Sequence, residues 1–529
     1  MQARMRASAR DPWRTLFVLA FVVLTALKVS IAATLAPFVD EAFYWQESRH
    51  PAWSYSDVPA LTAWLIRIGE TALGHSVLAM RVPFLILGAA IVVLIVRMAA
   101  DLGGSRAGWQ AGLWVLILPL AGTLGVLALP DVPLTFAAVL GLYAFGRAAR
   151  GNRRSDWILL GVALAIGWLS HYRAAMLLLA GIAFLVATPR GRSLWRTPGL
   201  WIALAISALG LLPMLAFNVG NDWAAAGFQF VERHPWTFQG ASLLQPIEQA
   251  LVTTPLLYGL LLAVLIAALR RSPQGAPWDL FGWAALVPIV VYFAIGLFAD
   301  GDRFRVHWPL AGYLPLLVLL VLLGREWIAH HRSLRWLIGG AAVMALSGTL
   351  AVLSYFAAAA SPALASQLTG LKLFPKHLVG WNESAAATRV LLDDSEFADS
   401  VLVADNFMLA AQLDFAFGGR QRIYVLDNPL NARHGRAHQL ALWSRDENAL
   451  RAQGARGVLL VVEETALRER DRSTWLNALC ARVDMLRLVQ RVDLYDGRKR
   501  FALFSGVRRD VLATGMSCAY PSATALTEP

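Results

Sequence analysis

Hydrophobic residues fill long runs along the first two thirds of the chain, and the polar stretches between these runs are short. Residues 16–29, 82–96 and 310–323 show no polar face at helical spacing, whereas a surface helix of a soluble protein would show one. Apolar runs of this kind are long enough to cross a bilayer. The pattern therefore predicts a membrane protein that crosses the bilayer several times.

Eleven runs are predicted membrane spans, with ends that are approximate by several residues. They lie at residues 14–37, 80–98, 107–128, 132–149, 157–170, 172–188, 200–218, 248–269, 281–299, 309–324 and 336–356. The first run is longer than the core of a signal peptide, and no small-residue cleavage site is evident after it. We therefore interpret it as a retained span.

Arginine gathers in alternate connections between the predicted spans. It occurs before residue 14 and again within 97–106, 147–154, 190–196, 270–271 and 325–335. Arginine-rich connections face the cytoplasm, so the N-terminus is predicted there, and an odd number of spans places the C-terminal part outside. The same arginines account for the net charge of +12, and we expect no nucleic-acid partner.

Hydrophobicity falls sharply after about residue 360, which predicts a membrane domain over 1–358 and an external soluble domain over 359–529. In the second part, residues 400–404, 422–426 and 457–462 are typical of buried strands separated by helices, which indicates an α/β layer structure. Residues 485–504, with Asp496-Gly497 near the middle, predict a hairpin. Cys480 and Cys518 both fall in this part, where a disulfide and two unpaired thiols are both open alternatives.

Ionisable residues recur at the membrane face opposite the arginine-rich connections. The first external loop carries Asp40, Glu41 and Asp57, and later turns on the same side carry Asp131, His171, Arg173, Asp300, Asp302, Arg303, Arg305 and His307. Such groups at the ends of apolar helices are costly unless they pair, stay hydrated or serve a site. Their gathering at one level therefore predicts a functional site there.

Each of these residues also has a structural interpretation that the sequence leaves open. Asp40 and Glu41 would also suit a helix cap or a solvated pair, and Asp131 stands where an N-cap belongs. His171 would also suit an interfacial histidine, and Arg173 a side chain that reaches to the interface. The last group, Arg303, Arg305 and His307, would also contact lipid headgroups, although its spacing suits a phosphate clamp as well.

An acid that orients or deprotonates a hydroxyl, together with cations for a phosphate, suggests glycosyl transfer from a lipid phosphate. The chain has no nucleophile-elbow motif, no Walker loop and no dinucleotide-binding glycine pattern. Two other classes remain open. One is a transporter or lipid flippase that uses the carboxylates as ion or proton sites, and the other is a non-enzymatic assembly or sensor protein that binds glycan.

Several short motifs resemble bacterial members of the protein mannosyltransferase family, glycosyltransferase family 39, whose relatives include the aminoarabinose transferases acting on lipid A. They are Asp40-Glu-Ala-Phe-Tyr-Trp45, Tyr55-Ser-Asp-Val-Pro59, Leu61-Thr-Ala-Trp-Leu-Ile-Arg67, Met80-Arg-Val-Pro83, Pro130-Asp-Val-Pro-Leu134, His171-Tyr172, Val306-His-Trp-Pro309 and Asp405-Asn-Phe-Met-Leu-Ala-Ala-Gln412. The resemblance spans nearly the whole chain.

This resemblance implies a GT-C fold with about eleven transmembrane helices and a periplasmic α/β domain in the bacterial inner membrane. It implies a polyprenyl-phosphate sugar donor, inverting transfer on the periplasmic side, and an acceptor that is lipid A, a polysaccharide or a protein. Asp40 is then the expected catalytic base, supported by Glu41 and Asp131. Two carboxylates could also bind a divalent ion, but the resemblance implies transfer without a metal or other cofactor. The donor site is expected at Tyr44, Tyr55, Asp57, His171, Arg173, Arg303, Arg305 and His307.

Two positions depart from the family pattern. Relatives usually carry a basic residue before the proline of the Tyr-x-acid element, and this chain has Val58 there. Relatives often carry lysine where this chain has His171. The sequence therefore leaves one expected phosphate contact unassigned, with Arg303, Arg305, His171 and Arg173 as the candidates to replace it.

Overall fold

The computed structural model describes residues 11–234, 236–298, 306–453 and 457–508. The chain divides into two compact units, and each takes more than one segment of the sequence. The helical unit comprises Met1–Ala33, Val58–Gly69 and Leu78–Tyr355, and the mixed unit comprises Thr34–Asp57, Glu70–Val77 and Phe356–Pro529.

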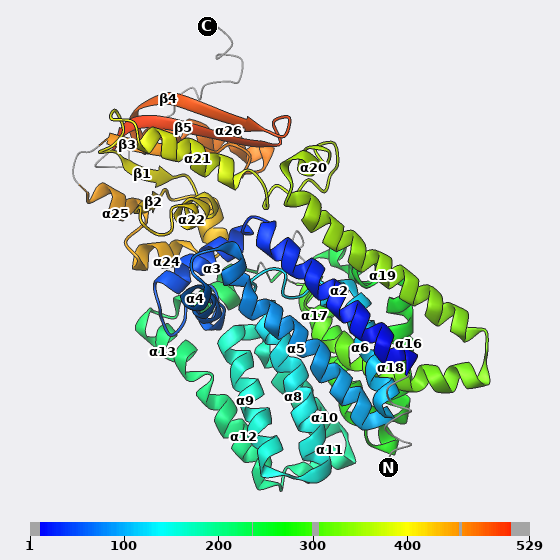
Figure 1. Cartoon of the computed structure of the whole chain (residues 1–529). Helices are drawn as coiled ribbons and strands as arrows, with labels where there is room; N and C mark the ends of the chain where they lie inside the picture. The colour runs from blue at the N-terminus through cyan, green and yellow to red at the C-terminus, as the bar shows by residue number, and fades with distance from the viewer. Residues whose placement is uncertain (1–10, 235, 299–305, 454–456, 509–529) are drawn as a thin grey trace. The chain divides into compact units, whose positions relative to one another are not determined.

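The helical unit is built from long apolar helices joined by short connections (Figure 1). Its main helices are α2 (Pro12–Thr34), α5 (Val77–Gly103), α6 (Ser105–Ile117), α8 (Asp131–Gly151), α9 (Arg154–Ser170), α10 (Ala175–Ala187), α12 (Pro198–Leu209), α13 (Leu212–Gly220), α16 (Pro255–Arg271), α17 (Trp278–Gly296), α18 (Leu310–His330) and α19 (Leu334–Ala359). Shorter elements among them include α4 (Leu61–Leu73), α7 (Pro119–Gly122), η1 (Tyr172–Ala174), α11 (Pro189–Leu194) and α15 (Gln245–Thr253).

Within the described residues, eight helices are long and apolar enough to cross a membrane, which confirms a multi-pass membrane protein. All eleven predicted spans contain helix, but three of them fall on shorter helices: 105–117, 154–170 and 172–187. Local backbone breaks explain the difference. The first of the three is interrupted at Leu118, which is extended, and the second ends at His171, which is also extended. Hydropathy alone does not reveal such breaks.

The arginine-rich connections meet at one end of the helical unit. Arg325, at the end of α18, donates to Gly103 O at 3.3 Å, and Arg271, at the end of α16, pairs with Glu326 at 2.7 Å. At the opposite end, Arg81 near the start of α5 donates to Ala32 O near the end of α2 at 3.0 Å. The alternation of charge predicted from the sequence therefore corresponds to two distinct ends of the unit.

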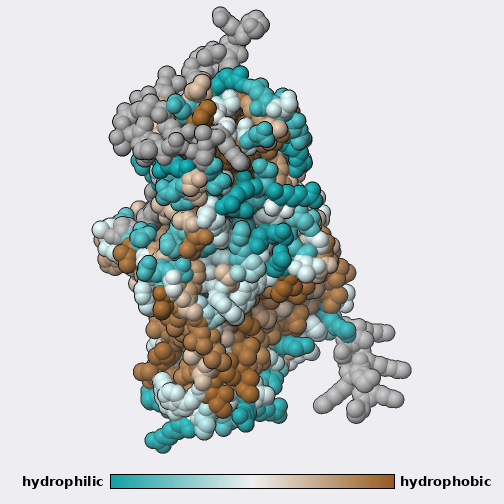
Figure 2. Space-filling view, turned by 90° about the vertical axis from the view of Figure 1, so that its left-hand side faces the viewer, coloured by the Kyte–Doolittle hydropathy of each residue, from teal (hydrophilic) through white to brown (hydrophobic). Residues whose placement is uncertain are grey.

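Hydrophobic side chains cover the outer surface of these helices, where a bilayer would contact them. Large apolar residues are exposed on α2 (Leu19, Val23), α5 (Ile86) and α19 (Trp336, Val343). Figure 2 shows such residues, in brown, gathered over the sides of the helices, with teal hydrophilic residues at their lower end. An aqueous solvent would not favour this surface, and a bilayer would.

The mixed unit contains a five-stranded sheet in the order β2-β1-β3-β5-β4. Strands β1 (Val401–Ala404), β2 (Ile423–Val425) and β3 (Gly457–Glu463) are parallel, whereas β4 (Val483–Leu494) and β5 (Lys499–Arg508) form an antiparallel hairpin next to β3. These are the three buried strands and the hairpin predicted from the sequence. The parallel strands read as continuous apolar runs because helices cover the sheet.

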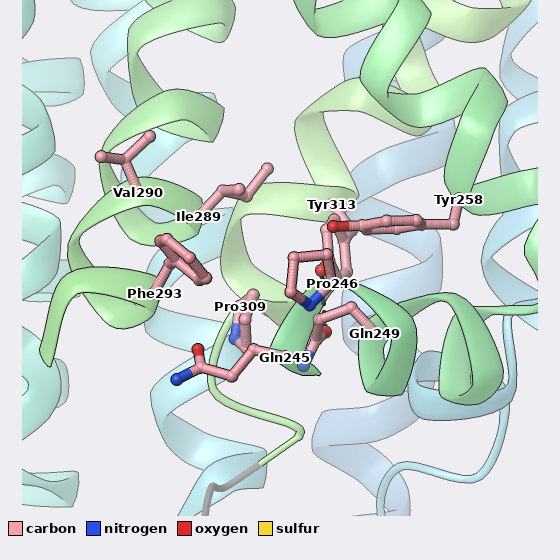
Figure 3. Close-up of a pocket in the computed structure, with 9 residues that line it drawn as sticks. All are labelled: Gln245, Pro246, Gln249, Tyr258, Ile289, Val290, Phe293, Pro309 and Tyr313. Carbon is pink, nitrogen blue, oxygen red and sulfur yellow. Dashed lines mark hydrogen bonds between the residues drawn. The ribbon is translucent and has the colours of Figure 1, made fainter. Parts of the chain in front are cut away.

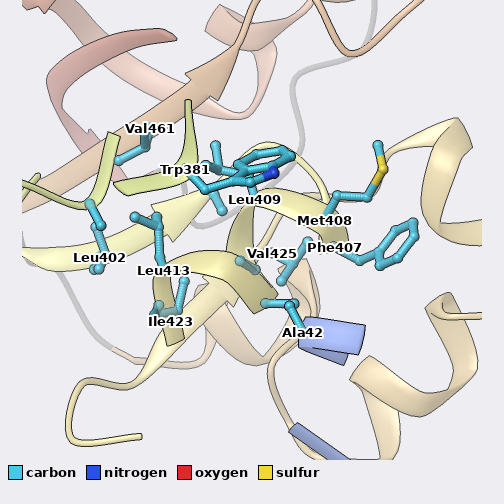
Figure 4. Packing of buried hydrophobic residues seen from close by; sticks show 14 of the residues in the cluster. Ala42, Trp381, Leu402, Phe407, Met408, Leu409, Leu413, Ile423, Val425 and Val461 are labelled. Carbon is cyan, nitrogen blue, oxygen red and sulfur yellow. The ribbon is translucent and has the colours of Figure 1, made fainter. Parts of the chain in front are cut away.

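The helices of the mixed unit are α3 (Val39–Arg49), α20 (Pro362–Ser366), α21 (Trp381–Leu392), α22 (Phe407–Ala416), α23 (Pro429–Arg433), α24 (Ala437–Leu442), α25 (Glu447–Arg451) and α26 (Glu469–Asn477). One core joins Leu402, Val425 and Val461 of the sheet to Leu409 of α22 and Ala42 of α3 (Figure 4). Helix α3 thus packs with residues beyond 356, although the sequence division at 358 had grouped it with the membrane part. Hydropathy along the chain does not specify which elements a short polar loop packs against.

Candidate functional site

The first turn of α3 carries the adjacent acids, and they have different surroundings. Phe38, which precedes the helix, is extended, and its backbone N–H donates to Glu41 Oε2 at 2.8 Å. The Glu41 side chain is fully buried, so its carboxylate serves as the cap that the sequence left open as an alternative. Asp40 lies beside this cap and makes a different contact.

Three acids surround one arginine in the mixed unit. Arg436 Nη2 lies 3.3 Å from Asp40 Oδ1, and Arg436 Nη1 lies 3.5 Å from Glu47 Oε1. The same Nη1 donates to Asp57 Oδ2. We call these four residues, Asp40, Glu47, Asp57 and Arg436, the acid cluster. The planar guanidinium therefore bridges α3 and the loop that follows it.

Only one acid of the cluster is accessible. The Asp40 side chain is 28% exposed, whereas those of Glu47, Asp57 and Arg436 are 0%, 4% and 3% exposed. Burial raises the pKa of Glu47 well above its usual value, and the negative charge of Asp57 adds to the shift. Because Asp40 is the accessible acid of the cluster, a hydroxyl group from solution would meet it.

Glu47 and Arg436 are the members of the cluster that the sequence analysis missed. Asp40 and Glu47 are seven positions apart, which places them on the same face of a helix two turns apart, so the spacing offered a signal for Glu47. Arg436 had no such signal, because it lies 396 positions from Asp40 and among other arginines.

The two tyrosines predicted for the donor site belong to the same neighbourhood. The Tyr44 ring lies 5.1 Å from the Arg436 guanidinium carbon, and burial raises the pKa of its hydroxyl. The Tyr55 hydroxyl is buried and donates to Glu47 O at 2.7 Å, which holds the loop after α3. Their contact with a donor stays a prediction, and so does that of Asp57, which is engaged by Arg436.

Helix α22 anchors α3, the helix that bears Asp40, through two hydrogen bonds and an aromatic contact. Gln412 Nε2 donates to Pro37 O at 2.7 Å, and Gln46 Nε2 on α3 donates to Asp414 Oδ2 at 2.8 Å. The rings of Phe43 and Phe407 meet edge to face with centroids 5.6 Å apart. The Asp405–Gln412 motif noted in the sequence thus supports the helix that bears Asp40.

A second group of charges lies in the helical unit, at the end opposite the arginine-rich connections. Asp131 is the first residue of α8, after the N-cap Pro130, and its Oδ1 receives a hydrogen bond from Arg173 Nη2. His307 Nε2 lies 3.2 Å from the same oxygen. We call Asp131, Arg173 and His307 the cation pair site, after the arginine and the histidine whose side chains converge on one carboxylate.

Nearby residues fix the positions of these cations. His171 is buried, and its Nδ1 accepts a hydrogen bond from the Arg173 backbone N–H at 3.1 Å, which starts η1. The Arg173 guanidinium carbon lies 5.5 Å from the centre of the Trp308 ring. His171 thus orients the turn that carries Arg173. Whether it also contacts the donor stays a prediction.

A cavity opens at the cation pair site. Asp131, Arg173 and His307 line it together with Tyr292, Trp308 and apolar residues of α8, α10 and α18. A charged head and an apolar chain would both find partners there. The chemistry of the lining is that of a site for an amphiphilic anion.

A separate cavity lies among α15, α16, α17 and α18, and none of the described residues that line it is charged (Figure 3). Its wall consists of Pro246, Ile289, Val290, Phe293 and Pro309, with Gln245, Gln249, Tyr258 and Tyr313 as the polar members. The Tyr313 hydroxyl donates to Gln249 Oε1 at 2.8 Å. Such a lining favours an uncharged or apolar occupant.

For the remaining predicted residues, the structure gives no evidence of a direct role in the site. Arg303, Arg305 and Cys518 lie outside the described residues, so a disulfide between Cys480 and Cys518 and two unpaired thiols both stay open alternatives. Val58 is buried and supplies no cation. Among the side chains that the structure describes, no group of three or more His, Cys, Asp or Glu is arranged to hold a metal ion, and the absence of a metal requirement stays a prediction.

The comparisons with known proteins agree with this architecture. Residues 57–217 match the sequence profile of the dolichyl-phosphate-mannose-protein mannosyltransferase family, which confirms the family resemblance for that segment. No curated protein sequence gave a significant match. The chain resembles the crystal structure of ArnT from Cupriavidus metallidurans bound to undecaprenyl phosphate, with a TM-score of 0.65, 16% identity, and coverage of 96% of this chain and 100% of that one.

The structure of the same ArnT in the apo state gives a TM-score of 0.66, again with 16% identity and coverage of 96% of this chain and 100% of that chain. At this identity the likeness establishes the fold. The protein therefore has the GT-C fold predicted from the sequence, with a smaller domain that contains a sheet.

Proposed function

We propose that this chain with the GT-C fold is a membrane glycosyltransferase that moves a sugar from a polyprenyl-phosphate donor to a hydroxyl or phosphate of a cell-envelope acceptor. The acceptor would be lipid A, a polysaccharide or a protein, and transfer would invert the anomeric centre. The fold match to a transferase structure that holds undecaprenyl phosphate supports the class of donor.

The observation that carries this proposal is the accessibility of Asp40 within a buried acid cluster. Asp40 would accept the proton of the acceptor hydroxyl while its oxygen forms a bond to the anomeric carbon. The bond between that carbon and the phosphate oxygen breaks at the same time, and polyprenyl phosphate leaves with the electron pair. An acceptor phosphate would arrive already ionised and would need no base.

The leaving phosphate requires cations, and the cation pair site has them. Arg173 and His307 would bind the phosphate oxygens, with Asp131 holding both side chains in place. Cations fixed before the reaction stabilise the charge that develops on the leaving group. The apolar cavity of Figure 3 is our candidate for part of the isoprenoid chain, because its lining is largely hydrocarbon.

We further propose that the protein resides in the bacterial inner membrane with its arginine-rich end in the cytoplasm. The gathering of Arg271 and Arg325 at one end of the helices supports this orientation. The cation pair site would then lie at the periplasmic level, where lipid-linked sugars can serve as donors without a soluble nucleotide.

The test is a transfer assay with the purified full-length protein in detergent or nanodiscs. A panel of polyprenyl-phosphate sugars would be offered with lipid A, glycan and peptide acceptors, and the products identified by mass spectrometry. We expect one donor to be consumed by the wild type, and transfer to fall by at least about a thousandfold in Asp40→Asn, whose melting temperature should be unchanged. Donor flipping in vesicles without product would instead favour a flippase, and full activity in Asp40→Asn would remove Asp40 as the base.

A further inference from the structure

Arg436 holds a position that the proposed reaction does not by itself explain. It is buried, it belongs to the sheet-containing unit, and its guanidinium reaches the acid that we propose as the base. The rings of Phe43 and Phe407 lie 4.2 and 5.6 Å from its guanidinium carbon, so the side chain is held on its faces as well as at its edges.

The two arms of the guanidinium have different partners. Nη1 is directed to Asp57 and Glu47, which are buried, whereas Nη2 is directed to Asp40, which is partly exposed. Because Asp57 is buried and accepts a hydrogen bond from Nη1, whereas Asp40 is partly exposed, Asp57 is the fixed counter-ion and Asp40 is the one that solvent reaches. Asp57 thus anchors the guanidinium and leaves the second arm for Asp40.

The backbone around this anchor is also secured to the mixed unit. The Ser56 hydroxyl donates to Gly435 O at 2.7 Å, and the Ser56 backbone N–H donates to Gln439 Oε1 at 3.0 Å. Hydrogen bonds from Ser56 and Arg436 therefore tie the loop that bears Asp57 to residues 435–439, and contacts with α22 hold α3 in place.

We propose that Arg436 is a positioning residue for the catalytic base: it keeps the Asp40 carboxylate ionised and fixes its orientation toward the acceptor hydroxyl. This inference rests on the proposed function. It assigns to the C-terminal part of the chain a direct part in transfer, because Arg436 lies 396 positions beyond the acid that it would orient. A cation within hydrogen-bond distance favours the charged form of a carboxylate.

The test compares variants that change the guanidinium without removing the whole cluster. Arg436→Lys keeps a charge but loses the fork, and Asp57→Asn/Arg436→Met removes the arginine together with its buried counter-ion, so that no uncompensated Asp57 charge remains. Arg445→Lys is the matched control, because Arg445 pairs at 2.6 Å with Asp414, which also binds Gln46 of α3, so this variant disturbs the support of α3 while Arg436 is unchanged.

We expect Arg436→Lys to lower kcat about tenfold while KM for donor and acceptor changes less than about twofold. In the double variant, the acid limb of the pH profile of kcat should move up by about one pH unit or more, so that alkaline buffer restores part of the activity. Arg445→Lys should leave the acid limb in place. An acid limb that stays put in both Arg436 variants, or one that moves equally in Arg445→Lys, would overturn the proposal.

A second readout does not depend on turnover. A carbodiimide with an amine modifies carboxyl groups in their protonated form, so the modification of Asp40 against pH, quantified by mass spectrometry, follows its ionisation. Removal of Arg436 should shift that curve to higher pH. If the wild type turned over no donor, the proposed function would fail while this curve still decided the role of Arg436. Failure of both Arg436 variants to fold, with Arg445→Lys folded, would assign Arg436 a structural role only.

Discussion

Arg436 and Asp40 are 396 positions apart in the sequence, yet the guanidinium Nη2 of the first lies 3.3 Å from the carboxylate Oδ1 of the second. The contact joins the Asp40–Trp45 motif, which follows the first apolar run, to a residue of the C-terminal part that begins where hydrophobicity falls. It also distinguishes the two adjacent acids, since Glu41 accepts the capping hydrogen bond, whereas Asp40 contacts the arginine and is partly exposed.

Because Glu41 caps α3, its substitution should affect folding stability more than the rate of transfer. Glu41→Ala removes the acceptor for the Phe38 N–H and should cost about 1 kcal/mol of folding free energy, with a lower melting temperature. Glu41→Gln keeps an acceptor oxygen, so it should lower kcat only a few-fold. Thermal melting and transfer rates would be measured together. A loss in Glu41→Gln as deep as that in Asp40→Asn would show that Glu41 takes part in proton transfer.

If the cation pair site binds the donor phosphate, loss of Arg173 should weaken binding of the donor. Arg173→Gln removes a charged donor at the cavity, and a charge-assisted hydrogen bond to phosphate is worth about 1.5–3 kcal/mol. KM for the donor should therefore rise about tenfold or more in steady-state assays, with a smaller change in acceptor KM. Arg147→Gln is the control, because Arg147 pairs with Asp156 at 2.9 Å at the other end of the helices. Equal effects from both variants would contradict a phosphate contact.

The raised pKa of the buried Asp405 side chain should make the mixed unit less stable as pH rises. Burial raises its pKa to about 8, whereas an unfolded aspartate titrates near about 3.9. Below the lower value both states are protonated and the folded state bears no penalty. As pH rises toward about 8 the unfolded state loses its proton first, so this group makes folding progressively less favourable.

Asp405→Asn mimics the protonated acid and should flatten that decline, so that the variant melts at a higher temperature than the wild type near pH 8 and at a similar temperature near pH 4. Circular dichroism melts of the full-length protein at a series of pH values would measure it. Parallel curves for the two proteins would show that Asp405 does not carry the dependence.

The hydrogen bond from Gln412 of α22 to Pro37 O should protect α3 from local unfolding. Gln412→Ala leaves a buried carbonyl unpaired, at a cost of about 1–3 kcal/mol, and should speed amide exchange in residues 39–49. Transfer should fall because Asp40 loses its fixed place. Gln490→Ala, at an exposed position on β4, serves as the control. Unchanged exchange in α3 would mean that its packing does not depend on this bond.

The sequence by itself determined most of the elements, although not the breaks at Leu118 and His171. Long apolar runs specified the membrane helices, and three short apolar runs with Asp496-Gly497 specified the strands and the hairpin. These features are predictable because hydrophobic period and turn chemistry act over a few neighbouring residues. The adjacent acids, the Pro130-Asp131 turn and the cations near 171 and 307 were visible for the same reason, since each stands at the end of an apolar run.

Only the tertiary structure decided which of these residues meet. In the folded chain, α3 packs with residues beyond 356, and Glu41 accepts the capping hydrogen bond of this helix. Arg436 lies between Asp40 and Asp57. The fold also turned Arg173 and His307 toward one oxygen of Asp131. These pairings depend on how segments hundreds of residues apart pack together. The shape of the surrounding core decides which of many arginines meets the acid, and no local pattern in a single sequence specifies it.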